Sequence, residues 1–367
     1  MTPIDPDATP KTVALYRSLK NLAGNALLFG HQDDLAYGST WWAEPGRSDV
    51  REVAGAYPAV FGWDLGRIEL GSPQNIDDVD FGSLREWIRQ AYAMGAVNTL
   101  SWHCVDPVTG GGYGSTPTPR AISYVLPGGS RHATLISWLD RVADFVADLV
   151  DDHGDPIPIV FRPYHEHTGD WFWWGIDNGL NSVADFTALW RFTVDHLRRS
   201  RGLHQLLYAI SPDRSRMDIA DLARHYLDSY PGDDYVDVLG FDNYWDTGHV
   251  ANTTPREQQY RDYVRSLEVV SQLAQARDKV AALTETGTVG DVTDPWTDYL
   301  LKAVTANEHT RRIAWSLVWR NPFGSSDGGS PTPGSATAAD FAALHQDPFT
   351  RFQDTVPALY RPEQPGV

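Results

Sequence analysis

The sequence predicts an α/β protein with a single (β/α)8 fold, a TIM barrel. Eight short apolar or β-branched segments, each bounded by turn residues, occur at 27–31, 58–64, 95–103, 158–166, 205–212, 236–244, 279–287 and 313–321. Helical patterns lie between these segments. Strands that alternate with helices form parallel sheets, and eight parallel strands close into a barrel.

The stretches between the predicted strands have the spacing of amphipathic helices. Apolar residues recur every three or four positions, which places them on one face of a helix. Two examples are Ile136, Leu139, Val142, Val146 and Leu149, and Tyr260, Val264, Leu267 and Val270.

One barrel domain is expected to occupy residues 1–367. Two stretches, at about 105–131 and 321–337, are rich in glycine and proline and resemble interdomain linkers in composition. Each directly follows a predicted strand, and the loops at that end of the strands build the functional face of such barrels. We therefore expect long active-face loops at both places.

Composition excludes several classes of partner. The chain has 30 Lys plus Arg against 48 Asp plus Glu, a formal charge of −18, which repels nucleic acids and anionic membranes. A single cysteine, Cys104, cannot form an intrachain disulfide. No segment is apolar enough to span a membrane, and no phosphate loop, dinucleotide fingerprint or cysteine-based zinc spacing is present. We expect no cofactor and no metal.

Two glutamates occupy corresponding places in the predicted barrel. The apolar segment that ends at Phe161 turns polar and places Glu166 at the end of strand four, and Glu285 lies at the end of strand seven. Glycoside hydrolysis requires two carboxyl groups, one that donates a proton and one that is ionised. Each glutamate alone would also fit a structural ion pair, but the pair predicts a hydrolase.

Aromatic residues are dense near these glutamates. The chain has 14 Trp, 16 Tyr and 13 Phe, and Trp171, Phe172, Trp173 and Trp174 follow Glu166 closely. Flat rings suit stacking against the apolar face of a sugar. So many bulky rings in one loop suggest a sugar-binding surface, although loop packing can account for part of them.

Two other classes of function remain open from the residues alone. His31, His103 and His165 also lie at predicted strand ends, which fits a metal-dependent barrel hydrolase. The first strand lacks the usual His-x-His pair, but His165 and His167 flank Glu166 and keep this alternative open. The aromatic surface alone would also fit a non-catalytic glycan-binding protein.

One long motif resembles glycoside hydrolase family 26, the β-mannanase family. Residues 162–175 read RPYHEHTGDWFWWG, and shorter matches follow the same order along the chain. These are GHQDDLAYG at 30–38, WH at 102–103, GFDNYW at 240–245, TETG at 284–287 and WR at 319–320. The resemblance independently implies a barrel with its acid/base after strand four and its nucleophile after strand seven.

The resemblance also implies roles for individual residues. Glu166 would be the general acid/base and Glu285 the nucleophile, with Tyr244 holding Glu285 in position. His165 would bind the sugar near its 2-hydroxyl. The remaining substrate-binding candidates are His103 and Trp319 around the sugar that contributes C1, Trp171 beside the cleavage point, and Arg162, Asp242, Trp174 and Arg320.

The implied activity is that of a retaining endo-β-1,4-mannanase. Such an enzyme hydrolyses internal bonds of mannan, galactomannan or glucomannan by double displacement. Alternatives within the family are an exo-acting enzyme that releases mannobiose, a β-1,3-1,4-glucanase and a β-1,3-xylanase. A polysaccharide cannot enter a cell, so we expect a secreted monomer whose signal peptide is not part of this chain, although a cytoplasmic location is not excluded.

Overall fold

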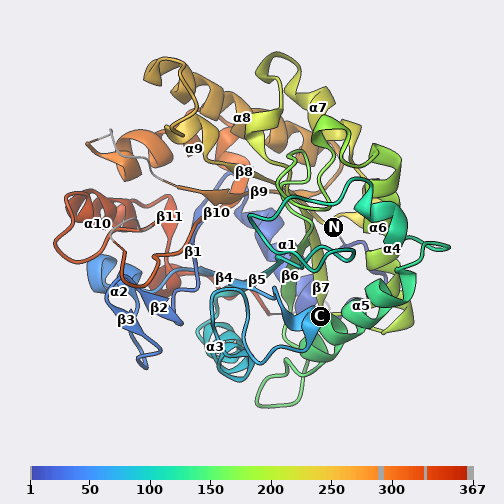
Figure 1. Cartoon of the computed structure of the whole chain (residues 1–367). Coiled ribbons are helices and arrows are strands. Elements are labelled where there is room, and N and C mark those ends of the chain that lie inside the picture. Colours follow the sequence, from blue (N-terminus) through green and yellow to red (C-terminus); the bar gives the residue numbers. More distant parts are fainter. Residues whose placement is uncertain (1, 288–292, 326–328, 362–367) are drawn as a thin grey trace, which may run out of the picture.

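The structure is a computed structural model that describes residues 2–287, 293–325 and 329–361. Its centre is a closed barrel of parallel strands (Figure 1). In order around the barrel these are β1 (Leu27–Gln32), β4 (Val60–Asp64), β5 (Val97–Trp102), β6 (Ile159–Pro163), β7 (Leu206–Ile210), β8 (Val238–Asn243), β9 (Val280–Thr286) and β10 (Ile313–Val318). Pairing of β10 with β1 closes the ring. The predicted TIM barrel is confirmed, with one strand in each predicted segment.

Helices surround the barrel on its outer side (Figure 1). The two helices predicted from apolar spacing are α5 (His132–Ala147) and α8 (Arg256–Ala276). The others outside the barrel are α2 (Asp49–Ala54), α3 (Phe81–Ala93), α4 (Ala121–Val125), α6 (Val183–Asp195), α7 (Leu222–Asp228), α9 (Lys302–Val304) and α10 (Ala338–Gln346). Side-chain caps begin several of them; Asp80, for example, accepts a hydrogen bond from the Ser83 backbone N–H at 2.9 Å at the start of α3.

One end of the barrel is closed by α1 (Pro10–Leu22). Its buried side chains Leu15, Tyr16 and Leu19 pack against inward-facing strand residues such as Val160 and Val280. The N-terminal ends of the strands are therefore covered by an apolar plug, and Figure 1 shows α1 across the middle of the ring. The opposite end, where the strands finish, is the end at which such barrels build their functional sites, and it is called the mouth below.

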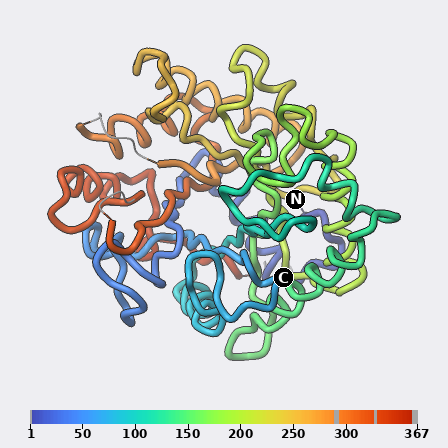
Figure 2. Tube along the Cα trace, in the orientation of Figure 1, coloured from blue at the N-terminus to red at the C-terminus, as the bar shows by residue number. Residues whose placement is uncertain are grey.

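Three loop regions border this mouth. A short hairpin of β2 (Tyr37–Gly38) and β3 (Trp41–Trp42) follows β1. The expected loop at 105–131 follows β5 and crosses the face of the ring as the teal segment of Figure 2. The expected loop at 321–337 follows β10, although its residues 326–328 lie outside the described residues. Among the described residues, none of the helices has the length and apolar character needed to cross a membrane.

Candidate active site

The backbone after β6 turns Glu166 toward the barrel mouth. The strand ends at Pro163, and both Tyr164 (φ 52°) and Glu166 (φ 53°) adopt the left-handed conformation that non-glycine residues rarely take. The Glu166 N–H donates to the Ser211 carbonyl at 2.6 Å, which ties the turn to the end of β7. Such strain persists only where surrounding contacts enforce it, and it commonly marks functional sites.

A register shift in β9 directs Glu285 toward the barrel mouth. Between β8 and β9, Phe241 pairs with Leu283 but Asp242 pairs with Glu285, so β9 has one extra residue at Thr284. Bulges of this kind redirect the side chains that follow them. Here the bulge brings Glu285 beside Asp242.

The carboxylates of Glu166, Asp242 and Glu285 meet at the mouth. One oxygen from each lies within 4.8 Å of the others. Retaining glycosidases hold their two carboxyl groups about 5–5.5 Å apart, whereas inverting enzymes need roughly 6.5–9.5 Å to fit a water molecule. The nearest oxygens of Glu166 and Glu285 are closer than the inverting range, which agrees with a retaining pair.

Glu285 is held by a donor at each oxygen. The Arg162 guanidinium contacts Glu285 Oε1, and it also donates to Asp242 Oδ2 at 2.9 Å. The Tyr244 hydroxyl donates to Glu285 Oε2 at 2.9 Å, and burial raises the pKa of Tyr244 well above its usual value, so it keeps its proton. With only 4% of its surface exposed and a donor at each oxygen, Glu285 is fixed in one orientation.

Asp242 completes the support of Arg162. Its second oxygen, Oδ1, accepts hydrogen bonds from Ser211 Oγ at 2.6 Å and Thr284 Oγ1 at 2.8 Å. Asp242 is fully buried, so these bonds compensate for the loss of water. Arg162 thus bridges two carboxylates and positions the second of them, Glu285.

Glu166 lies in a different electrostatic environment. Burial raises the pKa of its carboxyl group well above the usual value, and the charges of Glu285 and Asp242 raise it further. One hydrogen bond acts in the other direction, from Trp171 Nε1 to Glu166 Oε2 at 2.7 Å. Glu166 is thus disposed to hold a proton, while Glu285 is bound by two hydrogen-bond donors. Two carboxyl groups in different environments can divide the acid and nucleophile roles in this way.

A chain of polar contacts joins Asp64, His103 and His165 on the other side of the mouth. Asp64, fully buried at the end of β4, lies 2.6 Å from His103 Nδ1, and His103 Nε2 lies 3.0 Å from His165 Nε2. Burial lowers the pKa of His103, but Asp64 outweighs it and raises that pKa above the usual value. Burial and the neighbouring His103 lower the pKa of His165 well below its usual value. His103 is therefore the donor across the pair.

Asp64 was missed by sequence reasoning, which considered glutamates and histidines at the strand ends but not this aspartate. The same rule of polar residues at strand ends would have found it, because it closes the predicted strand 58–64. Ser211 and Thr284, the hydrogen-bond donors to Asp242, had no sequence signal of their own.

The aromatic run after Glu166 only partly faces the mouth. Trp171 is half-buried, but Phe172, Trp173 and Trp174 are buried. Trp174 Nε1 donates to the His165 carbonyl at 2.7 Å, which supports the backbone beside Glu166. Most of these rings therefore pack inside the protein, so the loop packing that the sequence left open accounts for the larger part of this run.

Trp319 and Arg320 lie beside the histidine pair. The Trp319 ring is half-buried, with its centroid 6.0 Å from that of His103. Arg320 forms an ion pair with Asp77 at 3.0 Å. Both residues follow β10, so they border the mouth on the side of Glu285 that is remote from Glu166.

The strand-end histidines do not assemble a metal site. His31 Nδ1 lies 2.8 Å from Asp34, while His103 is bound to Asp64 and faces His165. Within the described residues, these three histidines do not bring their ligand atoms into one group. The carboxylates around Glu285 could attract a cation, but the Arg162 guanidinium already lies among them.

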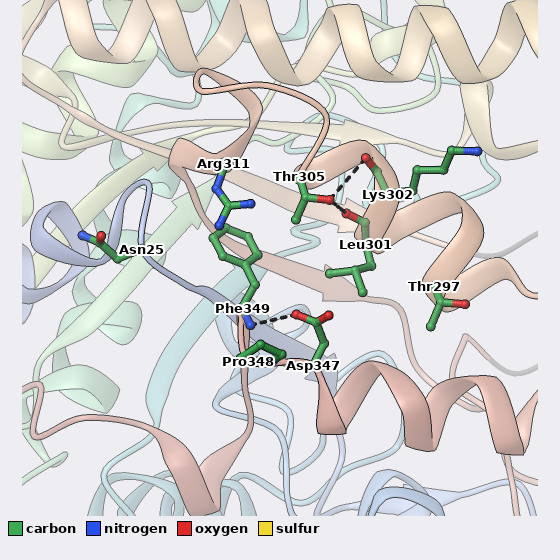
Figure 3. A pocket seen from close by; sticks show the side chains of 9 residues that line it. All are labelled: Asn25, Thr297, Leu301, Lys302, Thr305, Arg311, Asp347, Pro348 and Phe349. Carbon is green, nitrogen blue, oxygen red and sulfur yellow. Dashed lines mark hydrogen bonds between the residues drawn. The ribbon is translucent and has the colours of Figure 1, made fainter.

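A hollow elsewhere on the molecule lacks this chemistry. It lies near the N-terminal ends of the strands, because Asn25 precedes β1 and Arg311 precedes β10 (Figure 3). Arg311 stacks on Phe349 there, with the guanidinium carbon 4.2 Å from the ring centroid. Among the described residues that line the hollow, Asp347 is the only one with a carboxylate. Asp347 Oδ1 accepts a hydrogen bond from the Phe349 N–H at 2.8 Å. One carboxylate cannot provide the two roles of a glycosidase.

Comparison with known proteins decides the family. Residues 4–317 match the model of glycosyl hydrolase family 26. The chain belongs to this family. The match covers every strand that bears a catalytic candidate, and the glutamate positions after β6 and β9 agree with the resemblance drawn from the motifs.

Individual relatives support the assignment. A mannan endo-1,4-β-mannosidase of Bifidobacterium adolescentis is 35% identical over 356 residues, which cover 93% of this chain but 34% of that protein. The chain thus spans about a third of that relative's length. The structure of a family 26 β-mannanase from Bacteroides ovatus superposes with a TM-score of 0.88 at 40% identity, and covers 98% of this chain and 99% of its own.

A second solved structure adds to the likeness. The modular endo-β-1,4-mannanase of Cellulomonas fimi superposes with a TM-score of 0.86 at 36% identity. The match covers 98% of this family 26 chain and 79% of that one.

Proposed function

We propose that this family 26 enzyme is a retaining endo-β-1,4-mannanase that hydrolyses internal bonds of mannan, galactomannan or glucomannan. The observation that carries the proposal is the pair Glu166 and Glu285, whose nearest oxygens lie within 4.8 Å but whose environments differ. The names of the relatives at 35% and 40% identity support mannan as the substrate.

In the proposed first step, Glu285 attacks the anomeric carbon and Glu166 protonates the leaving oxygen. The bond between the sugar and the leaving chain breaks as the bond to the Glu285 carboxylate forms, which gives a glycosyl ester. Arg162 and Tyr244 hold both oxygens of the nucleophile, so little reorganisation is needed during attack.

In the second step, Glu166 acts as a base. It removes a proton from a water molecule that attacks the anomeric carbon, and the ester bond to Glu285 breaks. The product keeps the β configuration and Glu166 regains its proton. This step requires the pKa of Glu166 to fall once Glu285 is neutralised, and the structure supports such a fall because the charge of Glu285 is one cause of the raised pKa.

The residues around the pair provide sugar contacts in this proposal. The sugar that contributes C1 would lie beside His103, His165 and Trp319. Trp171 donates a hydrogen bond to Glu166, which places it beside the leaving group. Trp174 acts indirectly, through the backbone of His165. We further propose a monomer that acts outside the cell, where the polymer is found, and that has no nucleic-acid or membrane partner.

Product analysis on four polysaccharides tests the proposal. Purified protein is incubated with ivory-nut mannan, galactomannan, barley β-glucan and β-1,3-xylan, and products are separated over time. Manno-oligosaccharides of mixed length at early times would support endo action on mannan. A single short product would instead indicate release of mannobiose from chain ends. Turnover of β-glucan or β-1,3-xylan alone would replace mannan as the substrate, and inactivity on all four would refute the proposal.

A further inference from the structure

Two exposed aromatic side chains form a patch on the rim of the barrel mouth. Trp42, at the end of the β2–β3 hairpin, is 40% exposed, and Phe323, after β10, is 55% exposed. Their ring centroids lie 5.9 Å apart in an edge-to-face arrangement with an interplanar angle of 71°. A single exposed apolar side chain is common on protein surfaces. Exposed rings that lie together more often mark a binding site, so a binding role is the natural explanation for this patch.

The underside of this Trp42–Phe323 patch is fixed by stacking. The indole of Trp42 lies parallel to the buried ring of Tyr37, with centroids 4.9 Å apart and an angle of 6°. The Tyr37 hydroxyl donates to Asp33 at 2.8 Å, which prevents the lower ring from turning. One face of Trp42 is therefore covered, and its exposed surface is held in a constant orientation.

A buried carboxylate joins the two loops that carry the patch. Asp49 accepts hydrogen bonds from the Ser39 N–H at 3.0 Å, Trp41 Nε1 at 2.8 Å and Asn321 Nδ2 at 2.8 Å. The Gly324 N–H also donates to the Ser39 carbonyl at 2.9 Å. These bonds hold the hairpin and residues 321–324 together. Binding of a ligand to both rings therefore requires little further ordering of the protein.

The patch continues the catalytic site in one direction. Trp319 borders His103, and the next residue, Arg320, contacts the Tyr37 hydroxyl at 3.4 Å beneath Trp42. These residues follow β10, which pairs with the Glu285 strand β9, and β1, which pairs with β10. Both strands lie on the side of β9 that is remote from Glu166. Because the general acid lies toward the leaving group, a substrate chain that passes over Arg320 is the part that contributes C1 to the cleaved bond.

We propose that Trp42 and Phe323 form an outlying sugar-binding site for the retained part of a β-1,4-mannan chain. The sugar that it binds lies farther from the cleaved bond than the sugars beside His103 and Trp319. Stacking of a pyranose on Trp42 uses the apolar face of the sugar, while Arg320 provides donors between this site and the reaction centre. The inference rests on the proposed mannanase function and adds a preference for long substrates.

Aryl β-manno-oligosaccharides of two lengths test this site. The aryl leaving group fixes the cleaved bond, so an aryl mannobioside ends before the outlying site, whereas an aryl mannotetraoside extends over it. For Trp42→Ala we expect kcat/KM to fall about 3- to 10-fold on the tetraoside, from the loss of one stacking contact, and to stay nearly constant on the bioside. Trp42→Phe, which keeps a flat ring, should restore most of the loss.

Tyr124→Ala is the matched control, because Tyr124 is 41% exposed but lies on α4, between β5 and β6. It should leave the ratio of the two rates unchanged. An unchanged ratio in Trp42→Ala, or an equal loss on both substrates, would overturn the inference while leaving the mannanase function intact. A wild-type protein that cleaves neither compound would instead overturn the proposed function.

Discussion

Removing the Tyr244 hydroxyl should weaken catalysis by a predictable amount. Tyr244 donates to Glu285 Oε2 at 2.9 Å, while Arg162 contacts the other oxygen. In Tyr244→Phe the carboxylate keeps one of these two donors. A hydrogen bond to a charged group contributes about 1.5–3 kcal/mol, and about 1.4 kcal/mol corresponds to a tenfold change in rate. We therefore expect kcat/KM to fall about 10- to 150-fold.

The assay is steady-state hydrolysis of mannohexaose, with melting temperature as a measure of folding. Tyr263→Phe is the control, because the buried Tyr263 hydroxyl lies 3.3 Å from Thr286 Oγ1 on the same strand as Glu285 but is not bonded to the Glu285 carboxylate. That variant should change kcat/KM by less than about threefold. Similar losses in the two variants, or no loss in Tyr244→Phe, would refute the assigned role of Tyr244.

Four further substitutions test the roles of other residues. Glu166→Ala should spare aryl mannosides with good leaving groups far more than mannan, whereas Glu285→Ala should abolish both activities; equal losses in Glu166→Ala would count against the acid/base assignment. Asp64→Asn removes the charge that raises the pKa of His103, so kcat/KM should fall about tenfold. Its decrease on the alkaline side of the pH profile should also begin at a lower pH than in the wild type. An unaltered pH profile would contradict this role. His167 is buried with its pKa lowered to about 3, whereas an unfolded histidine gains its proton near pH 6.5. The stability that it contributes is present above pH 6.5 and decreases as the pH falls, by about 2 kcal/mol between pH 7 and pH 5. Denaturant unfolding of His167→Gln at both pH values should lack this component, and an identical pH dependence in the variant would exclude it.

The barrel was predictable because its signals are local. Each strand is a short apolar run, and periodic apolar positions such as those from Ile136 to Leu149 mark the helices. Polar residues at strand ends also placed Glu166 and Glu285 on the same face before any contact was known. Parallel strands bring their C-terminal ends together, so this step needs no long-range information.

The details of the site depend on contacts that a linear pattern does not contain. The sequence predicts a strand through Glu166, but β6 ends at Pro163 because Tyr164 and Glu166 adopt left-handed dihedral angles. The bulge at Thr284 that sets Glu285 beside Asp242 is likewise a property of strand pairing.

The burial of the aromatic run was unpredictable for a similar reason. Trp173 Nε1 donates to the Cys104 carbonyl at 3.2 Å, in a loop that is remote in the sequence. The segment at 111–117 and the run from Trp171 to Trp173 line one narrow pocket, so the loop after β5 covers these rings. The composition of the run could not show which rings this loop would bury.

The anomeric configuration of the first product distinguishes attack by Glu285 from direct attack by water. Hydrolysis of an aryl β-mannobioside is followed by proton NMR from the first minutes, before the released sugar mutarotates. Because the nearest oxygens of Glu166 and Glu285 lie within 4.8 Å, we expect the β anomer to appear first and the α anomer only later. Initial release of the α anomer would contradict it, because inversion requires water to attack in place of Glu285.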